Sequence, residues 1–177
     1  MVIISFRGEI MFKWRDFYLM KVCNTRGKTL GIISDIYINI ANITIDGFAI
    51  SPTGLFKRKN FISIKSVISI EDGIMVANEA EKFNGTKFKS IKYIDVINDE
   101  DITIGVLDDL IIAKKTLEIK GLILSSGIFD SMIKGKEIIN VKHCKICDGY
   151  IKYSGNDSVK VKTLPHSLGV IKDVKKI

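Results

Sequence analysis

The most constraining feature of this sequence is an internal repeat. Four blocks of the first half recur in the second half in the same order, separated by short gaps of unequal length. The paired blocks are Gly31–Ile38 with Gly105–Ile112, Asp46–Ser51 with Lys120–Ser125, Ser63–Val67 with Asn140–Cys144, and Asp72–Met75 with Asp148–Ile151. Such a repeat indicates two copies of one structural unit. Each copy spans roughly 60 to 65 residues, a small core unless its sheet closes into a barrel.

Within each copy the apolar runs are short and rich in β-branched residues. In the first copy the runs are Leu19–Cys23, Leu30–Ile38, Ile43–Ser51, Phe61–Ile68 and Ile74–Ala77. Segments containing Gly, Asn or Asp separate them, and β-branched side chains favour strands. Because closing a sheet protects its edges, the sequence predicts an all-β fold of two tandem small antiparallel β-barrels, with about six strands each.

The repeat also predicts the domain organisation. The first barrel is expected over residues 12–77 and the second over residues 88–153, joined by a polar linker at 78–87 that contains an Asn-Gly turn signal. A basic tail at 154–177 follows. Its block 168–174 repeats the Leu-Gly-x-x-x-Asp-hydrophobic pattern, either as a vestigial third repeat or as a strand added to one barrel. The sequence leaves open whether residues 1–10 belong to the fold.

The first copy resembles a known family, the PRC-barrel domain. The resemblance rests on a strand followed by the Gly27-Lys28 turn and then by Leu30-Gly31-Ile-Ile-Ser-Asp35-Ile. It covers about residues 15–77 and 88–153, although Asn98–Asp101 replaces the Gly-Lys turn in the second copy. The resemblance implies compact barrels of about six strands and a role in docking onto a larger assembly, but no single activity.

The residues that recur between the copies are expected to have structural roles, with Asp35 and Asp109 in backbone capping or turns. These residues are Gly31, Asp35, Gly47, Asp72 and Gly73 in the first copy, and Gly105, Asp109, Gly121, Asp148 and Gly149 in the second. The acidic run at 99–101 occupies a predicted turn, so we interpret it as solvated. Without a recognisable nucleophile, base or phosphate loop, the sequence predicts no catalytic residues and a non-enzymatic protein.

The motif His143-Cys144-Lys-Ile-Cys147 suggests a zinc site, since it offers two thiols and an imidazole. A structural zinc site needs four ligands, and only Cys23 and His166 remain as further soft ligands. Cys144 also aligns with Val67, an expected core position, and a buried cysteine behaves as a small apolar residue. We therefore predict neither a metal nor another cofactor.

The net charge of +7 permits an anionic partner. Phe56, Lys57, Arg58 and Lys59 combine basic and aromatic side chains in one loop, which suits RNA. The alternative is a solvated hairpin whose phenylalanines turn inward. A protein partner is favoured by the family resemblance, which predicts an adaptor or docking module. The alternative function is an RNA- or ribosome-associated assembly factor that uses this loop.

The compartment is expected to be the cytoplasm. No run of eighteen apolar residues is present, so the sequence predicts no transmembrane helix. Three cysteines fit a reducing compartment better than a disulfide framework. Neither the partner nor the oligomeric state follows from the residues.

Overall fold

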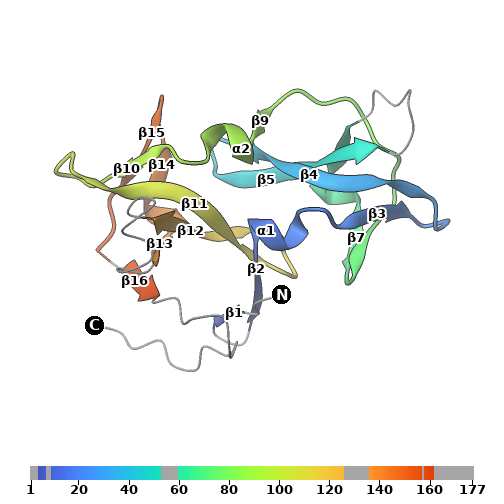
Figure 1. The fold of residues 1–177 in the computed structure, drawn as a ribbon, viewed down its shortest axis with the longest axis horizontal. Helices are drawn as coiled ribbons and strands as arrows, with labels where there is room; N and C mark the ends of the chain where they lie inside the picture. The colour runs from blue at the N-terminus through green and yellow to red at the C-terminus, as the bar shows by residue number, and fades with distance from the viewer. Residues whose placement is uncertain (1–3, 7–8, 53–59, 126–135, 157, 162–177) are drawn as a thin grey trace. The chain divides into compact units, whose positions relative to one another are not determined.

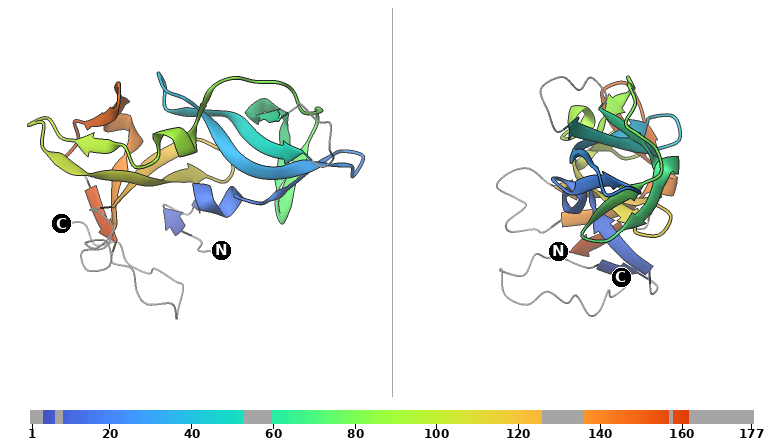
Figure 2. Two further views of the ribbon diagram at one scale, coloured as in Figure 1. Left: turned by 45° about the horizontal axis from the view of Figure 1, so that its top comes forward. Right: turned by 90° about the vertical axis from the view of Figure 1, so that its right-hand side faces the viewer.

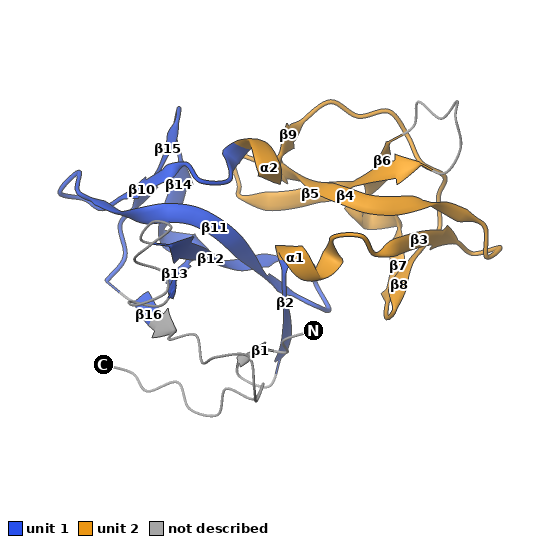
Figure 3. Ribbon diagram, in the orientation of Figure 1, with its two compact units in different colours: residues 1–13, 91–177 blue, residues 14–90 orange. Residues whose placement is uncertain are grey.

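A computed structural model describes residues 4–6, 9–52, 60–125, 136–156 and 158–161 (Figure 1, with two further views in Figure 2). Strands dominate these residues, and the predicted all-β class is confirmed. The two α-helices among them are single turns, α1 (Trp14–Phe17) and α2 (Phe88–Ile91). The chain forms two compact units, unit 1 with residues 1–13 and 91–177 and unit 2 with residues 14–90 (Figure 3).

Unit 2 is built on one sheet with a continuous path of six strands. In spatial order they are β6 (Phe61–Ser63), β5 (Thr44–Pro52), β4 (Thr29–Asn39), β3 (Lys21–Asn24), β8 (Gly73–Val76) and β7 (Val67–Ile70). The short strand β9 (Thr86–Lys87) also pairs with β4, and the 3-10 turn η1 (Ile64–Ser66) connects β6 to β7. Every pair is antiparallel except β3 with β8.

Unit 1 repeats this arrangement and extends it. Its strands are, in order, β14 (Cys144–Ile146), β15 (Tyr150–Tyr153), β10 (Asp95–Ile97), β11 (Thr103–Ala113), β12 (Ile119–Ser125), β13 (Lys136–Asn140) and β16 (Ser158–Val161). The strand β2 (Glu9–Lys13) pairs with β11 and with β1 (Ile4–Phe6), and the 3-10 turn η2 (Val141–His143) connects β13 to β14. Again one pair, β10 with β15, is parallel.

The two long strands β4 and β11 carry the same irregularity. The register shifts between Ile33 and Asp35 in one and between Leu107 and Asp109 in the other. At both shifts the carboxylate is buried, and its Oδ1 accepts a hydrogen bond of 2.9 Å from the next backbone N–H. A β-bulge leaves one residue outside the ladder, so this local bond satisfies a backbone donor there.

The turns that follow β3 and β10 are also the same, although their sequences differ. Asn24 Oδ1 accepts hydrogen bonds from the backbone N–H groups two and four residues later, at 3.1 and 3.0 Å. Asn98 Oδ1 does the same at 3.0 and 2.9 Å. Gly27 and Asp101 take equivalent left-handed positions, with φ of 75° and 58°. The asparagine therefore determines this turn, and Asp101 substitutes for glycine because aspartate tolerates that conformation.

The second half of each long strand pairs with a short strand that comes from the other repeat. In unit 2, β3 pairs with the first half of β4, while Lys87 of β9 lies opposite Tyr37 in the second half. In unit 1, β10 pairs with the first half of β11, while Lys13 of β2 lies opposite Ile111. Because Lys13 and Lys87 precede α1 and α2 at equivalent positions, the strand that begins each repeat pairs with the other repeat. The repeats exchange their first strands.

The observed boundaries of the two units differ from those expected from the sequence at residues 9–13 and 78–87. Residues 9–13 belong to unit 1, whereas the first barrel was expected to start at residue 12. Residues 78–87, expected to form a linker, pack on unit 2, where Glu81 exchanges backbone hydrogen bonds with Phe61 at 2.9 and 3.1 Å. The tail contributes β16, which pairs with β13, and the block 168–174 lies outside the described residues.

Candidate functional site

The recurring glycines lie where strands approach closely. A Cβ on Gly31 would be 2.4 Å from the carbonyl oxygen of Ser51, and one on Gly47 would be 2.1 Å from that of Ile62. A Cβ added at the equivalent positions in unit 1, Gly105 and Gly121, would lie 3.0 Å from a backbone oxygen of the next strand. The structure gives these glycines a packing role within the sheets. They are not gathered at one site.

The recurring Asp-Gly pairs lie in the turns that precede β8 and β15. Asp72 is exposed, and Gly73 is the first residue of β8, where an added Cβ would be 2.8 Å from the carbonyl oxygen of Lys21. Asp148 and Gly149 are both exposed, and Gly149 has a left-handed φ of 83°.

The acidic residues of the second copy occupy three different environments. Asp101 in the exposed turn pairs with Lys152 at 2.6 Å. Asp108 is nearly buried between Lys92, at 3.6 Å, and Lys136. Asp109 is fully buried in the bulge of β11. These carboxylates are thus engaged separately.

Burial determines the chemistry of Asp35, the counterpart of Asp109 in unit 2. Desolvation raises the pKa of its carboxyl above the ordinary value, and the N–H groups of Ile36 and Lys89 oppose that shift. The backbone N–H of Lys89, in the first turn of α2, donates to Asp35 Oδ1 at 3.4 Å, so Asp35 also stabilises the beginning of that turn. Such a role is structural.

The cysteines of the Cys-x-x-Cys motif lie in different settings. Burial raises the pKa of Cys144 to about 12, and its thiol donates to the carbonyl oxygen of Asn140 at 3.3 Å. Cys147 lies beyond β14, with its sulfur 3.9 Å from the carbonyl oxygen of Lys145. Among the residues that the structure describes, no three His, Cys, Asp or Glu side chains are grouped to hold a metal. His166 lies outside those residues.

Residues 56–59, the expected contacts with an anionic partner, lie outside the described residues. Phe61, which bounds that loop, is buried over Gly47 and stacks on Phe83, with ring centroids 4.2 Å apart. Tyr37 meets both rings edge-on. The Phe61 ring is therefore part of the protein's own packing.

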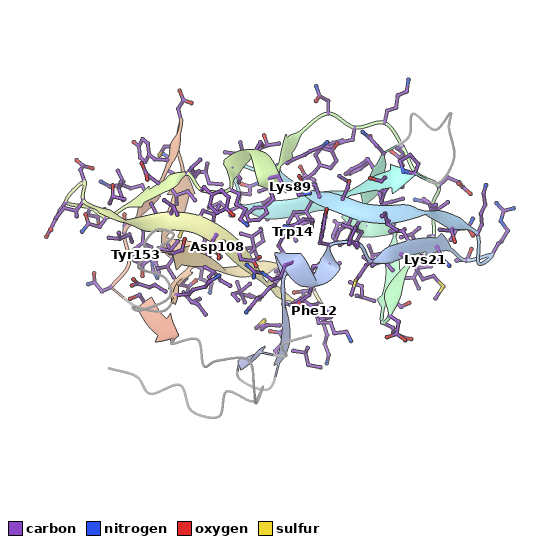
Figure 4. The ribbon with its side chains drawn as sticks, in the orientation of Figure 1. Phe12, Trp14, Lys21, Lys89, Asp108 and Tyr153 are labelled. Carbon is purple, nitrogen blue, oxygen red and sulfur yellow. The ribbon has the colours of Figure 1, made fainter. Side chains whose placement is uncertain are left out.

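A different surface emerges from the register of unit 2, on the outer side of β3 and β8. One row across the strands runs from Ile32 in β4 to Lys21 in β3 and Gly73 in β8. The next row runs from Cys23 in β3 to Met75 in β8 and Ser69 in β7. The alternate residues Val22, Ile74 and Ile70 are buried, so these rows face outward. We call the surface formed by Lys21, Cys23, Ile32, Ile68 and Met75 the β3–β8 face; Lys21, labelled in Figure 4, is exposed on it.

Three large apolar side chains on this face are exposed. The exposed fractions are 37% for Ile32, 39% for Met75 and 53% for Ile68. Ile68 is displayed by a bulge, because the β7–β8 register shifts between Val67 and Ser69. The matching pair in unit 1, β14 with β15, has no such shift. Bulges at sheet edges change the direction of side chains, so the bulge in β7 accounts for the exposure of Ile68.

The corresponding surface of unit 1 provides an internal control. There Val106 lies opposite Asp95, which lies beside Tyr150, and Lys152 lies opposite Lys145. A lysine, Lys152, thus takes the place of Met75 on this surface, whereas Val106, which takes the place of Ile32, is apolar and partly buried. The fold therefore does not require an exposed apolar side chain at the position of Met75 or a bulge that exposes Ile68.

Sequence reasoning missed the β3–β8 face. The run Val67-Ile-Ser-Ile70 predicts a strand but not which isoleucine points outward, since a one-residue bulge reverses the alternation. The sequence did contain one signal. An apolar residue that occurs in one copy and is replaced by a polar residue in the other marks a position where the fold itself does not need an apolar side chain.

Comparison with known proteins identifies a domain in the first half of the chain. Residues 9–83 match the family model of the PRC-barrel domain. The match begins at the first residue of β2 and includes every strand of unit 2 except β9. A comparison with curated proteins finds no match. Within the ranges that the structure describes, no helix is long and apolar enough to cross a membrane.

Proposed function

We propose that this chain is a non-enzymatic docking module in which two PRC-type barrels act in tandem and the β3–β8 face binds another protein surface. The observation that carries this proposal is the contrast between the two copies. Ile68 and Met75 are exposed in unit 2, whereas in unit 1 Lys152 takes the place of Met75 and the pair β14–β15 has no matching bulge. Exposed apolar residues that the fold does not require are typical of interaction sites.

The second PRC-type copy, over residues 88–153, is supported by the shared architecture. Both units place one parallel pair beside the long strand, both have a buried aspartate in its bulge, and both use an asparagine to form the turn before it. The strand pairing and the asparagine turn are not part of the block alignment, whereas Asp35 and Asp109 lie within it. These shared features support descent of both units from one ancestral domain.

The alternative function, association with RNA or a ribosome, depends on residues 56–59. The net charge of +7 favours it, but Phe61, the phenylalanine that follows this loop, stacks on Phe83 and is not offered to bases. We therefore place the protein–protein interface first. A cytoplasmic location belongs to the same proposal, supported by the absence of a disulfide among Cys23, Cys144 and Cys147.

The test is capture from the native lysate with three tagged proteins. They are the wild type, the double variant Ile68→Ser with Met75→Ser, and the control Ile102→Ser, which changes an exposed isoleucine of unit 1. We expect a defined protein to be retained by the wild type and the control and lost by the double variant. Retention by all three would refute the role of the β3–β8 face. Loss on nuclease treatment would favour the RNA alternative.

A further inference from the structure

The β3–β8 face has opposite charges at its two ends. Because β3 and β8 are parallel, both begin at one end of the face and finish at the other. Glu71 and Asp72 lie directly before β8, at the starting end, and both are exposed. Arg26 and Lys28 lie in the turn after β3, at the finishing end, and are also exposed. An acidic turn and a basic turn thus flank the apolar residues.

Neighbouring charges leave this difference in place. Lys65 lies just before β7, and Val67 pairs with Val76 at the basic end. At that end Glu79 lies 3.7 Å from Arg26, so three positive charges stand against one negative charge. At the acidic end two carboxylates stand against Lys21, which leaves one negative charge.

Such a face is complementary to itself. Turning a second copy by half a turn about an axis that lies in the plane of the interface, at right angles to β3 and β8, brings the two faces together with the acidic end of each copy over the basic end of the other. The apolar side chains then meet in the middle. A two-fold interface needs this property, because the same patch must recognise itself.

We propose that two copies of this chain form a symmetric dimer through the β3–β8 face, with Ile32, Ile68 and Met75 at its centre. This inference rests on the proposed docking function and names the partner. An anionic surface such as RNA or lipid would match the basic end alone, because Glu71 and Asp72 would repel it at the other end of the face. Main-chain addition of a strand to β7 is disfavoured by the bulge at Ile68, because a bulge interrupts the regular ladder that an added strand needs.

The first test is the molar mass in solution, measured by sedimentation over a range of concentrations. A monomer has a mass of 19.8 kDa, so a dimer doubles that value. We expect wild-type dimer at micromolar concentrations and at least a tenfold rise in the dissociation constant for Ile68→Asp, since a charge is then buried in an apolar contact. Ile102→Asp in unit 1 should leave the constant unchanged. Circular dichroism verifies that each variant is folded.

Charge reversal gives the sharper test. The variant Arg26→Glu with Lys28→Glu has two acidic ends, and the variant Glu71→Lys with Asp72→Lys has two basic ends. Each alone should dimerise about tenfold more weakly, since several exposed ion pairs become repulsive. An equal mixture should restore dimer formation, because every end then meets an opposite charge. Mixed variants that remain monomeric would contradict the two-fold arrangement.

The outcomes separate this inference from the proposed function. A wild type that stays monomeric at every concentration overturns the dimer. If it nevertheless captures a different protein that is lost in Ile68→Ser with Met75→Ser, the docking function stands. If it is monomeric and no capture depends on those residues, both fail. A dimer that is insensitive to Ile68→Asp and to charge reversal uses another surface and also overturns the inference.

Discussion

Met11 provides the most direct test of the strand exchange. It lies in β2 opposite Ala113 and is 4% exposed, in a cluster with Ile111, Ala113 and Ile123. Apart from Met11 itself, every buried member of this cluster comes from the second repeat. Met11→Ala should therefore destabilise unit 1, although Met11 lies in β2, the strand that begins the first repeat.

The size of the effect follows from the atoms removed. Truncating methionine to alanine removes about three heavy atoms, each worth roughly 0.8 kcal/mol when buried, and leaves a cavity that adds to the loss. Because the cluster is small, we expect a loss of about 2–3 kcal/mol, at the lower end of the range for buried methionine. At about 1.4 kcal/mol per factor of ten, opening of unit 1 becomes roughly 30- to 150-fold more frequent.

Hydrogen exchange resolved by peptide measures this directly. The amides of β11 and β12 should exchange about 30- to 150-fold faster in Met11→Ala, while those of β3, β4 and β8 should change little. The control is Ile10→Ala, which truncates the neighbouring side chain of the same strand, 42% of which is exposed. The fluorescence of Trp14, the one tryptophan of the chain, follows unit 2 independently. Unchanged exchange in β11, or equal acceleration in β4, would refute the pairing of β2 with unit 1.

Three further predictions concern single side chains. Burial raises the pKa of Asp35 above 3.8, so the free energy of unfolding, measured with urea, should fall as pH rises through the folded-state pKa. Asp35→Asn should abolish that decline. A pH profile that is the same in the wild type and the variant would contradict the assignment. Because the pKa of Cys144 rises from 9.0 to about 12, its thiolate fraction at pH 8 should be about a thousandfold below that of an ordinary thiol. Iodoacetamide should therefore label Cys147 before Cys144. Equal labelling rates would show that Cys144 is not buried. Asn98→Ala removes the acceptor of two backbone hydrogen bonds and should cost about 1–2 kcal/mol of urea-measured stability in unit 1. Asn98→Asp keeps that acceptor and should cost less.

Much of the fold could be predicted from the sequence. The repeat, the short β-branched runs and the glycine and asparagine punctuation are local patterns, and local patterns determine where strands and turns form. The turn at Asn98 illustrates the limit of motif matching. Its letters depart from the first copy, yet an asparagine at the same position gives the same hydrogen bonds.

Strand partners and side-chain exposure depended on the tertiary structure. Nothing local to residues 9–13 indicates that they pair with Ile111–Ala113, because hydrogen bonding between strands is made by backbone groups that every residue shares. The exposure of Ile68 likewise follows from a bulge, which changes the face of a side chain without changing the apolar pattern. The sequence by itself determined the elements and their repetition. Long-range pairing decided which strand completes which unit and which isoleucine reaches the surface, since both depend on contacts between distant segments.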